Sequence, residues 1–140
     1  MKAWKYKWLI LVLALAILAV CYFSNPFLRV KLFIILHHEK LEASLISYNS
    51  VPAIPGIDCH NTWEGKHTMT EFILFRTGFG SESKYYGCYY SWDDVPLAFQ
   101  NTQADLIQNG HQYWEWKDEG DNWGATQRIL PNWFYFEASF

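Results

Sequence analysis

The first two dozen residues constrain the fold and the location of this chain more than any other segment. Three lysines, Lys2, Lys5 and Lys7, precede an uncharged run from Trp8 to Phe23, and no later segment is comparably apolar. A run of this kind is typical of a membrane anchor or a secretory signal. Its sixteen residues would form a helix of about 24 Å, shorter than a hydrocarbon core of roughly 30 Å.

Three interpretations of this segment remain open, and we favour an uncleaved anchor. Aromatic residues at its two ends suit the interfacial belts of a bilayer; they are Trp4, Tyr6 and Trp8 at the start, and Tyr22 and Phe23 at the end. A cleaved signal peptide needs small residues before the cut, and Ala19-Val20-Cys21 fits poorly. A lipoprotein is the third option, because Leu18-Ala19-Val20-Cys21 resembles a bacterial lipobox with Val20 in place of a small residue.

The basic residues around this segment predict its orientation. The N-terminal side carries three lysines and the terminal amine, whereas the other side carries Arg29 and Lys31. Positive charge favours the cytoplasmic side. We therefore expect a single-pass protein of the cell membrane, bound to it through Trp8 to Phe23, with a cytoplasmic N-terminus and an extracytoplasmic C-terminal domain.

The rest of the chain divides into a helix and a β-rich domain. We assign residues 1–24 to the lysine-rich stub and anchor, 25–49 to an amphipathic helix, and 50–140 to the domain. Ser24-Asn25-Pro26 is typical of a helix start, and the stretch that follows places apolar residues along one broad stripe; they are Phe27, Val30, Ile34, Leu41, Leu45 and Tyr48. The helix either lies on a membrane surface or packs on the following sheet, and we favour the second.

From Ile57 onward the pattern predicts strands joined by short turns. The expected strands cover 57–63, 69–76, 85–91, 104–108, 111–117, 125–130 and 133–140. Asn109-Gly110 is the strongest turn signal, typical of a two-residue hairpin. Phe134, Phe136, Ala138 and Phe140 share one face of the last strand and are expected in the core. The fold class is therefore α+β, with an antiparallel sheet of about five to seven strands and the helix on one face.

The segment from Tyr85 to Phe99 carries the pattern Tyr-Tyr-Gly-x-Tyr-Tyr-Ser-x-Asp-Asp-x-Pro. It resembles a segment of a family of small, often membrane-anchored bacterial proteins with no assigned activity. The ending Asn132–Phe140 is similar to the C-termini of the same proteins. Cys88 and Trp92 stand where that family has an aromatic residue and a proline. The resemblance implies a shared fold and a bacterial origin, and it implies no site residues.

Charge and motif content exclude some functions and leave others open. From residue 50 onward the chain carries five Lys or Arg and twelve Asp or Glu, a net charge of −7, which argues against a nucleic-acid partner. No dinucleotide loop, phosphate loop or nucleophile elbow occurs, so we predict no cofactor and leave catalytic residues unassigned. The five histidines lack ligand spacing, and we interpret Asp93-Asp94 as turn chemistry rather than a calcium site.

Two cysteines follow the anchor, Cys59 and Cys88. Both fall within predicted strands, on presumed core faces, and another predicted strand separates them. A disulfide is possible outside the cytoplasm, but we favour two buried, reduced thiols.

The aromatic content supports the one specific functional hypothesis. The domain holds six tryptophans, which exceed what a core of about 90 residues commonly contains; they are Trp63, Trp92, Trp114, Trp116, Trp123 and Trp133. Some must be exposed, where they could stack on sugar rings or anchor a protein. The candidate binding residues are Trp63, Trp92, Trp114, Trp116 and Trp123. We predict a non-catalytic binding domain with a protein or cell-envelope glycan as its partner. The alternatives are a small cell-envelope hydrolase and a secreted or lipid-anchored carbohydrate-binding module.

Overall fold

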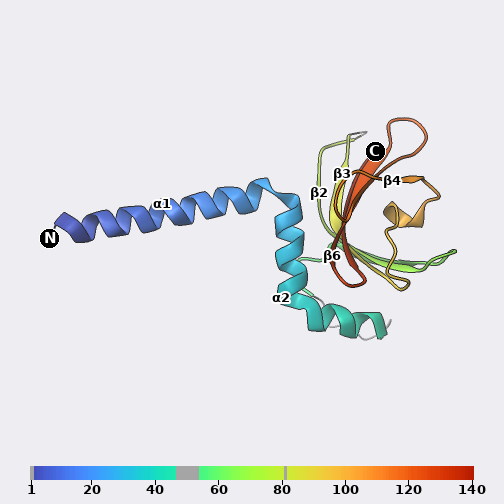
Figure 1. Ribbon diagram of the computed structural model, residues 1–140, viewed down its shortest axis with the longest axis horizontal. Helices are drawn as coiled ribbons and strands as arrows, with labels where there is room; N and C mark the ends of the chain where they lie inside the picture. The colour runs from blue at the N-terminus through green and yellow to red at the C-terminus, as the bar shows by residue number, and fades with distance from the viewer. Residues whose placement is uncertain (1, 47–53, 81) are drawn as a thin grey trace.

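Two N-terminal helices precede a seven-stranded sheet (Figure 1). The computed structural model describes residues 2–46, 54–80 and 82–140, with side chains from Tyr6 onward; Trp4 and Tyr48 of the sequence predictions lie outside that description. The helices are α1 (Lys2–Ser24) and α2 (Pro26–Ile46). The strands are β1 (Cys59–Trp63), β2 (Met69–Thr77), β3 (Lys84–Ser91), β4 (Leu106–Gln108), β5 (Tyr113–Lys117), β6 (Trp123–Leu130) and β7 (Trp133–Ser139), with a short 3₁₀ helix, η1 (Phe99–Asn101), before β4.

Helix α1 is longer than the uncharged run alone predicts. The segment Tyr6–Ser24 is 19 residues long and apolar enough to cross a membrane, and at 1.5 Å per residue it spans about 28 Å, close to the thickness of a hydrocarbon core. None of its side chains is buried against the domain, and Figure 1 shows the helix extending away from the sheet. The structure thus contains one candidate membrane span or signal segment within the described residues.

Helix α2 packs on the sheet, as we favoured from its apolar stripe. Its first turn is capped at Asn25, whose side-chain oxygen accepts a hydrogen bond from the backbone N–H of Leu28 at 3.0 Å. Val30, Ile34 and Leu41 are buried in full against the sheet. These three positions lie along one face of the helix, so the spacing in the sequence identified the correct face.

The sheet is antiparallel throughout, with strand order β1-β2-β3-β7-β6-β5-β4. The first three strands form one meander and the last four form another. The two meanders join where β3 pairs with β7, from Lys84↔Ser139 to Tyr90↔Trp133. The predicted α+β class, antiparallel arrangement and strand number are therefore confirmed.

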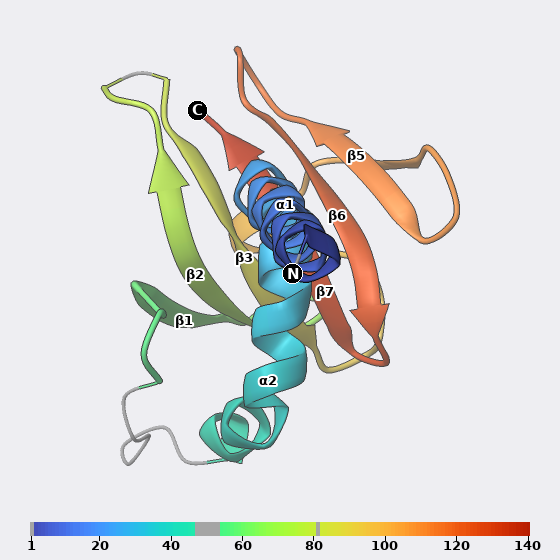
Figure 2. The ribbon, with the colours of Figure 1, turned by 90° about the vertical axis from the view of Figure 1, so that its left-hand side faces the viewer.

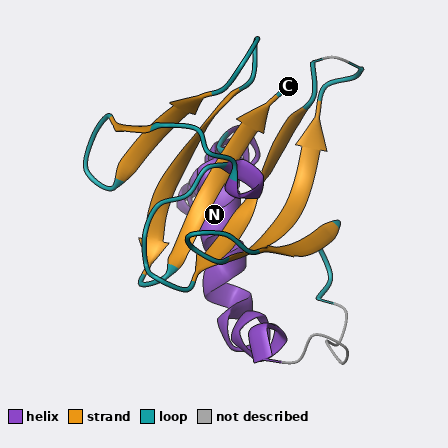
Figure 3. Ribbon diagram, turned by 90° about the vertical axis from the view of Figure 1, so that its right-hand side faces the viewer, coloured by secondary structure: helices purple, strands orange, loops and turns teal. Residues whose placement is uncertain are grey.

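The sheet has a hydrophobic core on each face. On the face under α2, helix residues pack on Phe72, Cys88, Trp133 and Tyr135. On the opposite face the core contains residues from the strands and from the segment that includes η1; its buried members are Met69, Ile73, Tyr89, Leu97, Ala98, Phe99, Trp116, Phe134, Phe136 and Ala138. Figure 3 shows this segment crossing the face that α2 leaves free. Alternate residues of the central strands therefore enter different cores.

Buried hydrogen bonds fix the segment over the second core. The Tyr89 hydroxyl accepts a hydrogen bond from the backbone N–H of Leu97 at 2.8 Å and lies 3.1 Å from the carbonyl of the same residue. The Thr126 hydroxyl oxygen lies 2.7 Å from that of Tyr89 and donates to the carbonyl of Tyr135 at 2.9 Å. Each of these polar groups is thereby satisfied in the interior.

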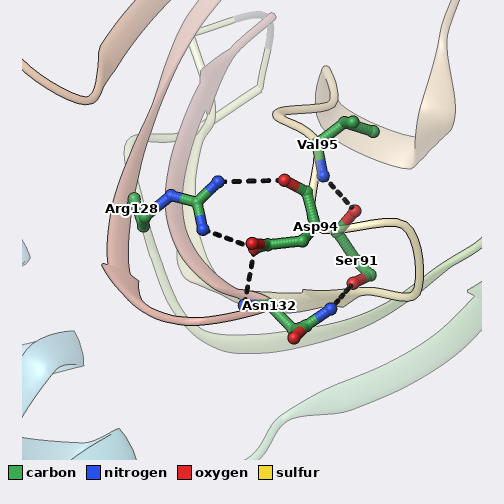
Figure 4. A network of polar contacts seen from close by, with 5 residues as sticks. All are labelled: Ser91, Asp94, Val95, Arg128 and Asn132. Carbon is green, nitrogen blue, oxygen red and sulfur yellow. Dashed lines mark hydrogen bonds and ion pairs between the residues drawn. The ribbon is translucent and has the colours of Figure 1, made fainter.

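Asp94 ties the end of β3 to the β6–β7 hairpin (Figure 4). Its carboxylate pairs with the guanidinium of Arg128 and accepts the backbone N–H of Asn132 at 2.7 Å. The hydrogen bond from Arg128 is the main cause that lowers the pKa of Asp94. Ser91 accepts the Asn132 side-chain amide and the backbone N–H of Val95. This carboxylate is engaged in the turn, in agreement with the turn interpretation of Asp93-Asp94.

Three sequence predictions need correction. The hairpin loop at Asn109-Gly110 contains three residues, Gly110 to Gln112, because the backbone N–H of Asn109 bonds to the carbonyl of Tyr113. The residues with positive φ are Gly110 and Gln112. The predicted two-residue turn would have placed positive φ values at 109 and 110. Phe140 packs against the rings of Tyr85 and Phe99 but remains 38% exposed, since it lies beyond β7.

The third correction concerns the cysteines. All three are free thiols, and Cys88 is buried as expected, but Cys59 is exposed. Cys59 is the first residue of β1, the edge strand of the sheet. Its partner Ile73 shares a face with Met69 and Tyr89, whereas Cys88 belongs to the opposite core. The two thiols thus lie on opposite faces of the sheet.

The packing of α2 predicts a contrast between two neighbouring positions. Ile34→Ala should lower the free energy of unfolding by about 2–4 kcal/mol, because it leaves a cavity in a buried cluster. Leu36→Ala, at a position 76% exposed, should change it by less than about 0.5 kcal/mol. Urea unfolding in detergent, followed by near-ultraviolet circular dichroism, measures both; equal losses would contradict the packing.

Candidate binding surface

The five candidate tryptophans do not form one surface. Trp63, Trp114 and Trp116 contact the core on the face opposite α2, and Trp116 is only 4% exposed. Trp92 and Trp123 are 49% and 42% exposed. The binding hypothesis therefore rests on the last two residues, and Trp116 has no exposed ring to offer a ligand.

The exposed tryptophans lie beside two separate grooves. Trp92 and Leu45 border a groove of about 420 Å³ near the end of α2. Trp123 borders a groove of about 430 Å³ over β4, β5 and β6. We develop the second groove as the candidate site.

Strand register builds the Trp123 groove. Trp123 pairs with Lys117, and Glu115 pairs with both Ala125 and Ile107. Because directly paired residues of antiparallel strands share a face, these side chains lie on the same side of the sheet. Tyr135 belongs to the α2-side core. It pairs with Gln127, which in turn pairs with Tyr113, so the groove lies on the α2 side of the sheet.

Helix α2 leaves this part of the sheet face uncovered. Figure 2 shows α2 in front of β3 and β7, with β5 and β6 beside it. Ile107 is 70% exposed here, and the small side chain of Ala125 lies between Glu115 and Glu137 in the register. The groove therefore combines the apolar side chains of Ile107 and Trp123 with the carboxylate of Glu115, a composition typical of ligand sites.

Hydrogen bonds hold the carboxylate of Glu115 in place. One oxygen accepts the Tyr113 hydroxyl and the other accepts the side-chain amide of Asn109, both at 3.1 Å. Burial, with added effects of Glu115 and Glu137, raises the pKa of Tyr113 to about 12. The neighbouring Tyr135 hydroxyl donates to Glu137 at 2.8 Å. Both tyrosines thus remain protonated donors. Tyr113 orients Glu115, which lines the groove, and Tyr135 orients Glu137, which lies outside the groove lining.

Cations lie around the indole of Trp123. The Lys84 ammonium lies 5.3 Å from the centre of the indole ring, within range of a cation–π interaction. Lys117, paired with Trp123 across the strands, lines the groove itself. The site therefore presents one aromatic plane, the fixed carboxylate of Glu115 and the ammonium of Lys117 to a ligand.

Histidines and carboxylates also meet outside the Trp123 groove. His67 Nδ1 lies 2.9 Å from a carboxylate oxygen of Asp93, on the surface, and borders neither tryptophan groove. His37, His38 and Glu39 border a third groove, on α2. Among residues 2–46, 54–80 and 82–140, no three His, Cys, Asp or Glu side chains come together in a metal-binding group.

Glu71 is a buried carboxyl that the sequence analysis did not single out. It is fully buried in β2, on the same face as Met69 and Ile73, and accepts the backbone N–H of Gln100 at 3.0 Å. Its other oxygen has no hydrogen-bond partner among the described residues. Burial raises its pKa to about 7, partly offset by Gln100 and by the nearby indole of Trp63. The sequence does contain a signal for its burial, because the alternation of β2 places this glutamate between two core positions.

Glu71 holds η1 rather than forming part of a groove. Gln100 and Asn101 both have φ near +55°, a conformation that costs energy in residues other than glycine. The bond to Glu71 and a 2.8 Å bond from the Asn101 side chain to the carbonyl of His67 support this turn. We therefore assign Glu71 a structural role.

Comparisons of this chain with protein-family models, with curated proteins and with solved structures find no match. The function is therefore argued from the geometry.

Glu71 predicts a pH dependence of stability. Its folded-state pKa is raised, so the folded state holds the proton more tightly and stability falls as pH rises from about 4.5 to about 7, by roughly 3 kcal/mol. Glu71→Gln keeps an acceptor for Gln100 and should remove this part of the slope. Urea unfolding of both proteins across that pH range measures the difference. The same dependence of unfolding free energy on pH in both proteins would contradict the raised pKa of Glu71.

Proposed function

We propose that this chain is a single-pass membrane protein that displays a small, non-catalytic binding domain outside the cytoplasm. Its ligand surface is the groove over β4, β5 and β6. The observation that carries the proposal is the exposed Trp123 beside fixed acceptors in a groove of about 430 Å³, on a sheet face that α2 does not cover.

The composition of the groove favours a carbohydrate ligand. A sugar ring presents a C–H face, which stacks on an indole, and hydroxyl groups, which bond to carboxylates and amides. Trp123 supplies the ring, and Glu115 supplies a carboxylate held in one orientation. A cell-envelope glycan is therefore the ligand that we propose, and a protein partner is the other outcome of the test.

The membrane placement rests on α1 and on the charge bias. Tyr6–Ser24 has the length of a span, and the lysines before it favour a cytoplasmic N-terminus. The resemblance of the segment from Tyr85 to Phe99 to small membrane-anchored bacterial proteins supports the same location.

Substitution of the two exposed tryptophans tests the ligand surface. Trp123→Ala should weaken binding to cell-envelope oligosaccharides about tenfold, because it removes the stacking plane. Trp92→Ala is the matched control, since Trp92 is equally exposed but borders the other groove. Calorimetric titration of the full chain in detergent measures both. Equal losses of glycan affinity in the two variants would overturn the proposed surface, and so would the absence of glycan binding by the parent protein. Binding of a protein partner without glycan binding would point to the second ligand class.

The exposed thiol of Cys59 tests the orientation. A membrane-impermeant maleimide should modify Cys59 in intact spheroplasts, because the residue is exposed on the extracytoplasmic domain, whereas Cys88 is buried. A Cys59→Ser variant gives the background labelling of Cys21. Modification of Cys59 only after the cells are lysed would show the opposite orientation.

A further inference from the structure

The outer face of α2 carries apolar side chains that neither the sheet nor α1 covers. Leu32, Ile35 and Leu36 are 37%, 51% and 76% exposed, and half-buried Leu28 precedes them. The four positions follow helical spacing and lie opposite the buried face of Val30 and Ile34. The first half of α2 is therefore apolar on two opposite faces, and among the described residues the sheet covers one of them.

This outer face is oriented toward the side from which α1 leaves the domain. Figure 2 looks along α1, which is seen end-on, while α2 is seen from the side and lies between the viewer and the sheet. Figure 1 shows the same relation from the edge, with α2 crossing the line of α1. If α1 crosses a bilayer, α2 therefore runs along the surface of that bilayer.

The charge distribution along α2 fits the same placement. Lys31 is exposed beside the apolar stripe, and Arg29 lies over the ring of Phe75 at 3.8 Å from its centre. Basic residues next to an apolar stripe favour anionic lipid headgroups. The outer positions change to Glu39, Lys40 and Glu42 in the second half, where Figure 1 shows the helix bending back toward the sheet.

We infer that the Leu28–Leu36 face of α2 rests on the surface of the bilayer that α1 spans, so that α2 is a spacer with one face on lipid and the other on the sheet. The inference rests on the proposed membrane placement of α1. Phe23, near the end of α1, is also exposed, at 71%, and it precedes this face by five residues in the chain. The two alternatives for α2 in the sequence are thus both realised, by opposite faces of one helix.

This placement also orients the candidate binding groove. The groove is on the same face of the sheet as α2, so it opens toward the bilayer across a gap of about one helix diameter, roughly 10 Å. A ligand then reaches Trp123 along the membrane surface.

Fluorophore labels at three exposed positions test the inference. Single cysteines replace Leu36 on α2, Leu15 on α1 and Phe79 in the β2–β3 loop, which is 97% exposed, in a chain that carries Cys21→Ser and Cys59→Ser. Each is labelled with an environment-sensitive dye, and the full chain is reconstituted in vesicles of zwitterionic and anionic phospholipid. The readouts are quenching by spin-labelled lipid and by aqueous iodide.

The label at position 36 should be quenched by lipid at least about twofold more than the label at position 79, and the label at 36 should be protected from iodide. Lipid quenching at position 15 but not at 36 would overturn the inference about α2, while the assignment of α1 as a membrane anchor would stand. Absence of lipid quenching at both positions would overturn that assignment as well. Equal lipid quenching at positions 36 and 79 would also overturn the inference, because it would show that the domain contacts the bilayer without a preferred orientation of α2.

Discussion

The pairing of β7 with both β3 and β6 is the contact on which the rest of the structure depends. It joins two meanders into one sheet and places alternate side chains of one strand in two cores. Trp133 and Tyr135 face α2, whereas Phe134, Phe136 and Ala138 face the segment around η1. A strand buried on both faces carries a nearly continuous run of apolar residues, as β7 does from Trp133 to Phe136, and this explains part of the high aromatic content.

The two cores also determine what remains exposed. Because α2 covers only β3, β7 and their neighbours, the same face of the sheet stays open over β4 to β6. The groove beside Trp123 is thus a consequence of a helix that is narrower than the sheet. In the proposed membrane arrangement, the same helix would also separate the sheet from the bilayer surface.

Individual residues show where sequence reasoning succeeded and failed. The burial of Cys88 was predicted correctly from its place in the 85–91 strand, because side-chain alternation is a local property of a strand. Cys59 was placed in the core by the same rule, and this was wrong, because β1 is an edge strand and strand order is not local. The burial of Trp116 beside exposed Trp123 likewise depends on which neighbours cover each face.

The sequence by itself determined the apolar α1 segment, the core face of α2, the α+β class and most strand positions, since these follow from hydrophobicity and from periods of 3.6 and 2 residues. Only the tertiary structure decided which tryptophans reach solvent, that Glu71 is buried beneath η1, and that α2 has a second, unpaired apolar face. Each of these depends on contacts between segments far apart in the chain, and such contacts leave no periodic signal.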